Sequence, residues 1–211
     1  MYSCFISYCH GQHELTKTFI DQLKGALKSY LEPLMDEEVY IDEERLKPGF
    51  NYNNALGRAI CESLCMIVVY SPKYERHDYC RQEFAAMRSV EEDRRSKLGS
   101  ALPREFGMII PIIFRGDVKM LPEEIRAHTQ FCDFTRFTTA DTDISKNPGY
   151  VKEIEAIANQ IYKLYESIRD AKVDVFSQCG LFQLPEKEKI PPWRAGAQVR
   201  SAPFPGREPA P

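Results

Sequence analysis

Two side chains that could act on a sugar lie one helical turn apart in the octet HDYCRQEF, residues 77–84. Tyr79 offers an aromatic ring and Glu83 a carboxylate, and a helix that begins near Asp78 would place both on one face. A carboxylate in this position can stabilise a cationic sugar in a transition state. Acidic residues are also common near helix N-termini, where the helix dipole favours them. The octet alone therefore indicates ordinary helix chemistry.

Alternating strands and helices are predicted to position this octet. Short apolar runs predict five strands, at residues 3–7, 37–42, 64–70, 108–114 and 129–134. Apolar residues at helical spacing predict helices over residues 15–30, 52–63, from 79 onward, 121–128 and 150–170. The alternation predicts an α/β fold of the flavodoxin-like, doubly wound class. Its five-stranded parallel sheet would have the order 2-1-3-4-5, with helices on both faces.

Sites in doubly wound sheets lie at the carboxyl ends of the strands. This rule selects four places in the chain: the segments after Ser7, Asp42, Tyr70 and Phe114. The octet follows the third of these places, so Glu83 is expected near the same edge of the sheet.

Composition predicts one folded domain over residues 1–175. Beyond Val175 the chain is rich in proline, glycine and charge, which predicts a Pro-rich linker or disordered tail over residues 176–211.

The charge and cysteine content argue against several classes of protein function and location. The chain has 28 basic and 31 acidic residues, a balance that argues against a dedicated nucleic-acid or membrane surface. No apolar run approaches the roughly 18 residues that span a bilayer, and no signal peptide is visible. The seven cysteines are scattered without a Cys-x-x-Cys pair, which predicts reduced thiols, a cytoplasmic protein and no metal site. The four histidines show no pattern beyond surface chemistry.

Other nucleotide-binding and phosphotransfer classes lack their motifs. There is no GxGxxG or Walker pattern, which disfavours Rossmann and P-loop chemistry. A flavodoxin or receiver-like domain is disfavoured as well, because the sequence has neither a Gly/Thr-rich phosphate loop nor an acidic pair after the first strand.

Several segments, taken in order, resemble the conserved boxes of TIR (Toll/interleukin-1 receptor) domains. CFISYCHGQHE resembles the first box, and IDEERLKPGFNYNNALGRAICES resembles the second. MIVVYSPKYERHDYCRQEF resembles the strand, serine and aromatic-Cys-x-x-Glu segment of the prokaryotic NAD-cleaving type. MIIPIIF and FCDF stand where the fourth strand and the third box are expected. The resemblance covers about residues 1–170.

The resemblance implies the roles of particular residues. Glu83 would be catalytic, and Tyr79 stands where the family often has tryptophan. The remaining implied substrate-binding residues lie at strand ends and in the loop after the second strand: Phe5, Ser7, Arg45, Lys47, Gly49, Tyr70 and Ser71. For Phe5, a place in the core is at least as consistent with the pattern.

The implied activity is that of an NAD+ nucleosidase in antiphage defence or cell-suicide signalling. It would release nicotinamide and either ADP-ribose or a cyclic isomer, with NAD+ as substrate and no cofactor. The alternative is a non-catalytic adaptor that acts by TIR–TIR assembly, and Glu83 discriminates because signalling-only members generally lack this glutamate. Self-association is implied in both cases, with the loop from Asp42 to Asn51 touching a neighbouring subunit, and a sensor or effector protein is a further expected partner.

Overall fold

The computed structural model describes residues 1–10, 14–41, 52–105, 107–126, 130–137 and 143–194. Its centre is one parallel sheet with the strand order β2-β1-β3-β4-β5. The strands are β1 (Tyr2–Tyr8), β2 (Glu38–Ile41), β3 (Ser63–Tyr70), β4 (Ile109–Ile113) and β5 (Cys132–Asp133). All four neighbouring pairs are parallel. The predicted fold class and strand order are confirmed.

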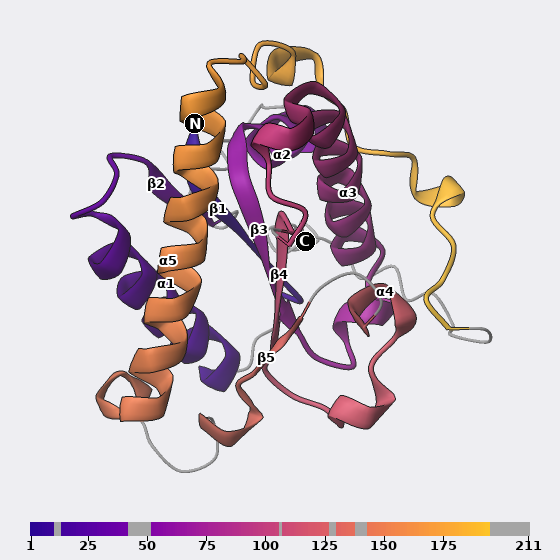
Figure 1. The fold of residues 1–211 in the computed structure, drawn as a ribbon. Helices are drawn as coiled ribbons and strands as arrows, with labels where there is room; N and C mark the ends of the chain where they lie inside the picture. Colours follow the sequence, from indigo (N-terminus) through magenta and orange to yellow (C-terminus); the bar gives the residue numbers. More distant parts are fainter. Residues whose placement is uncertain (11–13, 42–51, 106, 127–129, 138–142, 195–211) are drawn as a thin grey trace, which may run out of the picture.

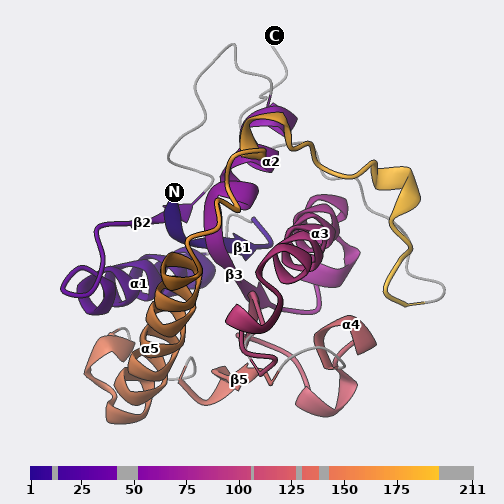
Figure 2. The same ribbon diagram turned by 45° about the horizontal axis from the view of Figure 1, so that its top comes forward.

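Two layers of helices cover the sheet (Figure 1). The α-helices are α1 (Glu14–Leu31), α2 (Tyr52–Glu62), α3 (Asp78–Leu98), α4 (Glu123–Arg126) and α5 (Pro148–Ala171). Helices α1 and α5 pack together on one face, and α2 packs with α3 on the other, as Figure 2 also shows. Among the described residues, no helix combines the length and the apolar character that crossing a bilayer requires.

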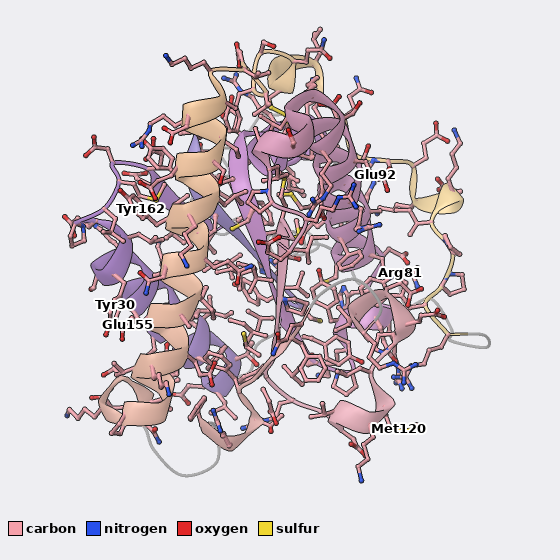
Figure 3. All side chains as sticks on the ribbon, viewed as in Figure 1. Tyr30, Arg81, Glu92, Met120, Glu155 and Tyr162 are labelled. Atoms are coloured by element: carbon pink, nitrogen blue, oxygen red, sulfur yellow. A yellow bond between two sulfur atoms is a disulfide. The ribbon has the colours of Figure 1, made fainter. Side chains whose placement is uncertain are left out.

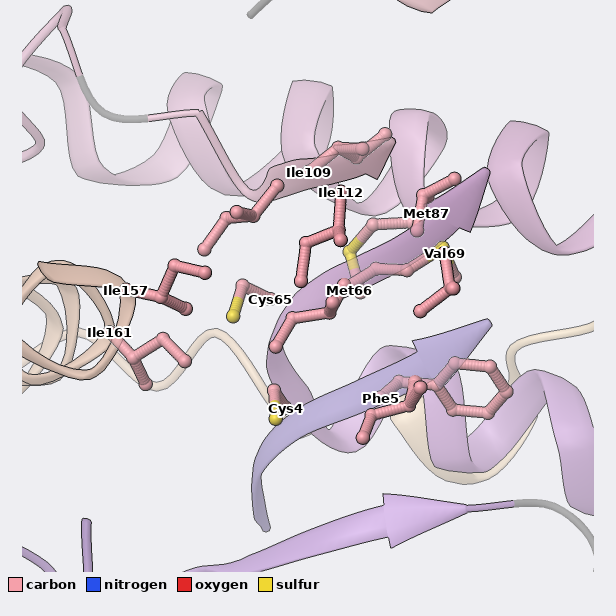
Figure 4. Packing of buried hydrophobic residues seen from close by; sticks show 14 of the residues in the cluster. Cys4, Phe5, Cys65, Met66, Val69, Met87, Ile109, Ile112, Ile157 and Ile161 are labelled. Carbon is pink, nitrogen blue, oxygen red and sulfur yellow. The ribbon is translucent and has the colours of Figure 1, made fainter. Parts of the chain in front are cut away.

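The central strand β3 is buried at every position, because helices cover both faces of a parallel sheet. Its Met66 pairs with Phe5 of β1 on one side and with Ile109 of β4 on the other. Figure 4 shows these residues packed together with Ile157 and Ile161 of α5 on one side of the sheet and Met87 of α3 on the other. This core fixes the carboxyl ends of β1 and β3, which carry the candidate site.

Pro111 lies within β4 and pairs in register with Val68 of β3. Proline cannot donate to a ladder, so a proline inside a strand usually marks a bulge or an unpaired position. The structure records no register shift between β3 and β4, and the ladder between β4 and β5 pairs only Ile112 and Ile113 of β4. Pro111 therefore has no ladder partner on the β5 side, which is where a strand tolerates proline.

Residues 176–194 pack against α2 and α3, which differs from the linker predicted from residue 176. Cys179 forms a disulfide with Cys61 of α2, so these two thiols are not reduced as the sequence suggested. A Cβ atom on Gly57 of α2 would lie 3.1 Å from the backbone of Phe182 and of Leu184, so glycine allows this close approach without a shift of the segment. In Figure 1 the segment then runs along α3. Residues 195–211 lie outside the described part of the chain.

Candidate functional site

A hydrogen-bonded cluster joins three elements at the carboxyl edge of the sheet. The hydroxyl of Ser7, near the end of β1, donates to Oε2 of Glu83 on α3 at 2.5 Å. The same hydroxyl lies 2.7 Å from the hydroxyl of Tyr74, in the short 3-10 helix Tyr74–Arg76 that follows β3. Glu83 is only 4% exposed, and Ser7 and Tyr74 are buried. The sheet-edge rule placed Ser7 and Glu83 near this edge, and the structure shows that the two side chains are in direct contact.

When Glu83 is charged, the hydroxyl groups of Ser7 and Tyr74 each have a defined hydrogen-bond acceptor. A charged carboxylate only accepts hydrogen bonds, so the proton of Ser7 points to Glu83. The hydroxyl of Tyr74 donates to the backbone carbonyl of Cys80 at 3.1 Å and also lies within reach of Ser7. Burial raises the pKa of Tyr74 well above its usual value, and the nearby Cys80 and Glu83 add to the effect. Tyr74 therefore keeps its proton and anchors both Ser7 and the first turn of α3.

The start of α3 sets the direction of Glu83. The helix begins at Asp78, with His77 as its N-cap residue and no side-chain cap hydrogen bond from His77. The helix start near Asp78 that the sequence predicted is confirmed. Asp78 accepts from Arg81 at 2.6 Å, an ion pair across the first turn that is almost entirely buried on the arginine side. Glu83 follows in the second turn, with its side chain toward Ser7 at the end of β1.

Tyr79 and Phe5 lie in surroundings that differ from those of a substrate-stacking pair. The ring of Tyr79 is covered by Lys187, whose Nζ lies 3.5 Å from the ring centroid. Phe5 is fully buried and stacks on Tyr40 of β2, with ring centroids 5.3 Å apart. Phe5 thus takes the core position that the sequence pattern allowed. Their implied roles in substrate binding stay predictions.

Tyr70 and Ser71 leave β3 at the same edge. The hydroxyl of Tyr70 donates to Oε2 of Glu75 at 2.7 Å, and Nε of Arg194 lies 2.9 Å from the other oxygen of Glu75. Burial and the adjacent Glu75 raise the pKa of Tyr70. Ser71 follows, half-buried. Arg45, Lys47 and Gly49 of the predicted cationic loop lie outside the described residues.

The C-terminal segment reaches this edge as well. Trp193 packs on Tyr74 and Phe84, with ring centroids 5.8 and 4.9 Å apart. Also on α3, the side chain of Gln82 donates to the carbonyl of Pro185 at 2.6 Å. Figure 3 places Arg81 and Met120 on this side of the molecule, and Arg194 donates to the carbonyl of Met120. Sequence patterns gave no sign of these contacts, because a Pro-rich segment has no periodicity.

A second cluster of reactive side chains lies beside Glu83. One ligand atom each of Cys9, His77 and Cys80 lies within 4.8 Å of the other two. Hydrogen bonding to Cys80 lowers the pKa of Cys9 to about 5, helped by hydrogen bonding and charge at His77, although burial opposes the shift. The hydrogen bond with Cys9 raises the pKa of His77, and burial raises that of Cys80.

This cluster was missed at the level of the sequence. The prediction of no metal site considered only Cys-x-x-Cys pairs, and His77 was grouped with surface histidines. The usable signal was the spacing His77-x-x-Cys80 at the start of a helix, which brings both side chains to one face. Cys9 joins them because β1 and the segment after β3 end at the same edge of the sheet.

A family model described as "TIR domain" matches residues 4–146, a range that contains both clusters. A comparison with curated proteins gives no match. Among solved structures, the chain is similar to the TIR domains of the activated Roq1 resistosome directly recognizing the pathogen effector XopQ. That alignment has a TM-score of 0.43 and 19% identity, and it covers 81% of this chain and 99% of the other.

Proposed function

Because the chain belongs to the TIR domain family, we propose that it is an NAD+ nucleosidase that cleaves the bond between nicotinamide and ribose. The observation that carries the proposal is the carboxylate of Glu83, held by Ser7 at the carboxyl edge of the sheet. Ligands of open α/β sheets bind at this edge. The products would be nicotinamide and either ADP-ribose or a cyclic isomer.

This reaction requires the protein to supply a fixed negative charge beside the ribose and to hold the ribose in place. When the bond from C1′ of ribose to the pyridinium nitrogen breaks, both electrons go to nicotinamide, which leaves neutral and needs no proton. The ribose becomes an oxocarbenium ion that water or an adenine nitrogen then attacks, and attack by water releases one proton to solvent. A fixed carboxylate stabilises this cation and orients the ribose hydroxyls, so one residue in the place of Glu83 meets the requirement.

Access to Glu83 must change before ribose can reach it. With 4% of its surface exposed, the residue offers almost no surface for a sugar to contact in this structure. An isolated subunit is therefore expected to have low activity. We propose that self-association, or contact with a sensor or effector protein, opens the edge and completes the site with the loop from Asp42 to Asn51. The setting would be the cytoplasm, in antiphage defence or cell-suicide signalling.

The burial of Glu83 also favours a second candidate function. A carboxylate that is buried and accepts a hydrogen bond from Ser7 is what a purely structural glutamate would show. In that case the chain would act as an adaptor by TIR–TIR assembly, without turnover of NAD+.

The test compares two carboxylates on the same helix. Glu83→Gln keeps size and hydrogen-bonding ability but removes the charge. Glu91→Gln is the matched control, because Glu91 is also buried on α3 and pairs with Arg95 at 3.0 Å. Nicotinamide release is measured by chromatography across a wide range of protein concentration, with and without a crowding agent. We expect Glu83→Gln to lose about 100-fold or more, as when one electrostatic stabiliser is removed, and Glu91→Gln to retain turnover.

Two results would count against this function. Equal turnover in the parent and in Glu83→Gln would remove Glu83 from the chemistry. If the parent releases no nicotinamide under any self-associating condition, the adaptor function is favoured over the enzyme. Turnover per subunit should rise with protein concentration, and it should be lower in Lys47→Glu than in the parent. If turnover per subunit does not change with protein concentration in either protein, assembly has no role in activity.

A further inference from the structure

We propose that Cys9, His77 and Cys80 form a binding site for a thiophilic divalent metal ion of the Zn²⁺ class. The site lies at the carboxyl edge of the sheet, beside Glu83 but separate from it. Its existence does not depend on the proposed NAD+ cleavage.

The three ligands come from positions that the fold fixes. Cys9 directly follows β1, His77 is the N-cap residue of α3, and Cys80 lies in the first turn of α3. Cys80 is 3% exposed and held in the helix, whereas Cys9 and His77 are half-buried. The helix therefore supplies one rigid ligand, and the other two can adjust from the side that solvent reaches.

The spacing of the ligand atoms fits a small tetrahedral ion after a modest contraction. The atoms lie within 4.8 Å of one another. Zn–S bonds of about 2.3 Å and Zn–N bonds of about 2.0 Å place tetrahedral ligand atoms roughly 3.5 Å apart. Rotation of the side chains of Cys9 and His77 can bring about a change of this size.

The donor types select the class of metal. Two thiolates and one imidazole suit Zn²⁺ and similar soft or borderline ions, whereas Mg²⁺ and Ca²⁺ require oxygen ligands. The nearest acidic residue in the sequence, Asp78, is engaged by Arg81 at 2.6 Å. Three protein ligands leave the fourth position of a tetrahedral ion for water or another small ligand.

A bound ion would connect the same elements that hold Glu83. It would tie the end of β1, through Cys9, to the first turn of α3, through Cys80. Tyr74 already links these two places, because its hydroxyl donates to the carbonyl of Cys80 and contacts Ser7. A metal ion would thus hold the closed arrangement around Glu83. If the chain cleaves NAD+ as proposed, occupancy should lower turnover.

The test uses Co²⁺ as the spectroscopic probe for this site. Full-length protein with the Cys61–Cys179 disulfide intact is treated with chelator, desalted and titrated with Co²⁺ at neutral pH. A site with two thiolates gives thiolate-to-cobalt charge-transfer absorption in the near ultraviolet and strong visible bands of tetrahedral geometry. We expect these bands to saturate at one equivalent of Co²⁺, and added Zn²⁺ to bleach them at one equivalent.

Single substitutions assign the ligands. Cys9→Ser, His77→Gln and Cys80→Ser should each remove or greatly weaken the bands. Cys132→Ser is the matched control, because Cys132 is a half-buried free cysteine on β5. Thermal unfolding with and without Zn²⁺ gives a second readout, in which the ion should stabilise the parent and Cys132→Ser but not His77→Gln. If Cys80→Ser fails to fold, the half-buried Cys9 and His77 still decide the result.

Three outcomes would overturn the site. The parent could show no charge-transfer bands, the bands could survive in Cys9→Ser, or Cys132→Ser could lose them as fully as Cys9→Ser does. A Cys9–Cys80 disulfide found by mass spectrometry in freshly purified protein would overturn it as well, since both thiols would then be consumed. None of these readouts involves NAD+, so a failure here is distinguishable from a failure of the proposed nucleosidase activity.

Discussion

The hydroxyl of Ser7 lies 2.5 Å from the carboxylate of Glu83, although 76 residues separate them in the chain. The contact joins the first strand to the helix that follows the third strand. It satisfies a carboxylate that is nearly removed from water. Hydrogen bonds to charged groups are among the stronger ones in proteins, so with Glu83 ionised this pair contributes both to stability and to the position of Glu83.

Threonine and valine at position 7 test this pair, because they share a shape and differ in the hydroxyl. Ser7→Val should be less stable than Ser7→Thr by about 1–3 kcal/mol, since it removes the hydrogen bond that Ser7 donates to a buried carboxylate. Urea unfolding measures the difference. The control is the same two substitutions, Thr and Val, at Ser3. Ser3 is also buried on β1 and has no described hydrogen bond to a carboxylate. If Glu83 is catalytic, Ser7→Thr should also retain more NAD+ turnover than Ser7→Val. Equal stability of the Val and Thr variants would contradict the assigned hydrogen bond.

The disulfide between Cys61 and Cys179 should contribute substantially to stability. It joins residues 118 positions apart, and cross-links that close long loops restrict the unfolded chain most. Replacing both cysteines with serine should lower the free energy of unfolding by roughly 2–5 kcal/mol. Chemical denaturation measures this effect, with Cys132→Ser as the control for loss of a free cysteine. A double variant as stable as the parent would show that the segment packs on α2 without help from the covalent link.

Arg94 is a buried cation whose loss should be costly. Its guanidinium donates to the carbonyl of Cys61 at the end of α2 and to those of Ser63 and Leu64 at the start of β3. It lies 4.5 Å from the ring centroid of Phe176. Burial lowers its pKa to about 10, which still leaves it charged at neutral pH.

Arg94→Met should destabilise the protein by about 3 kcal/mol or more, because each buried acceptor left without a donor costs roughly 1–3 kcal/mol. Arg94→Lys should rescue little of this, since one ammonium group cannot reproduce the planar fork. Thermal unfolding of the two variants gives the measurement. Full rescue by lysine would mean that the positive charge alone stabilises the protein here, rather than the several hydrogen bonds from the guanidinium to backbone carbonyls.

Cys9 should react as a thiolate at unusually low pH in metal-free protein. Its pKa is lowered to about 5, whereas burial raises that of Cys132 to about 11. The alkylation rate of Cys9 by iodoacetamide should therefore be nearly constant from pH 8 down to pH 6 and should fall as the pH drops through about 5. The rate at Cys132 should keep rising with pH up to about 11.

Peptide mass spectrometry in the presence of chelator resolves the two cysteines. His77→Gln removes one of the groups that lower the pKa of Cys9, so the midpoint of its rate profile should move to higher pH. A tenfold rise in the Cys9 rate for each pH unit between 6 and 8 would show an ordinary thiol.

The sequence predicts well the features that depend on short-range pattern. Apolar runs and helical spacing predict the strands, the strand order follows from the alternation, and the sheet-edge rule brings Ser7 toward Glu83. Pairings between distant residues are not encoded in this way. The partner of Cys61 is a choice among the six other cysteines that only packing decides, and Cys9 meets His77 only once the sheet exists. Trp193 and Arg194 are placed by contacts with α3 and its surroundings, which no local periodicity announces.

Trp193 gives the molecule an optical property of its own. It is the only tryptophan in the sequence, and it lies against Tyr74, which contacts Ser7 and thereby Glu83. Tryptophan emission shifts with the polarity around the indole ring, and nearby tyrosines pass excitation to it. The intrinsic fluorescence of the unlabelled protein therefore comes from one known position. A change in the packing around Tyr74 and Glu83 should change that fluorescence.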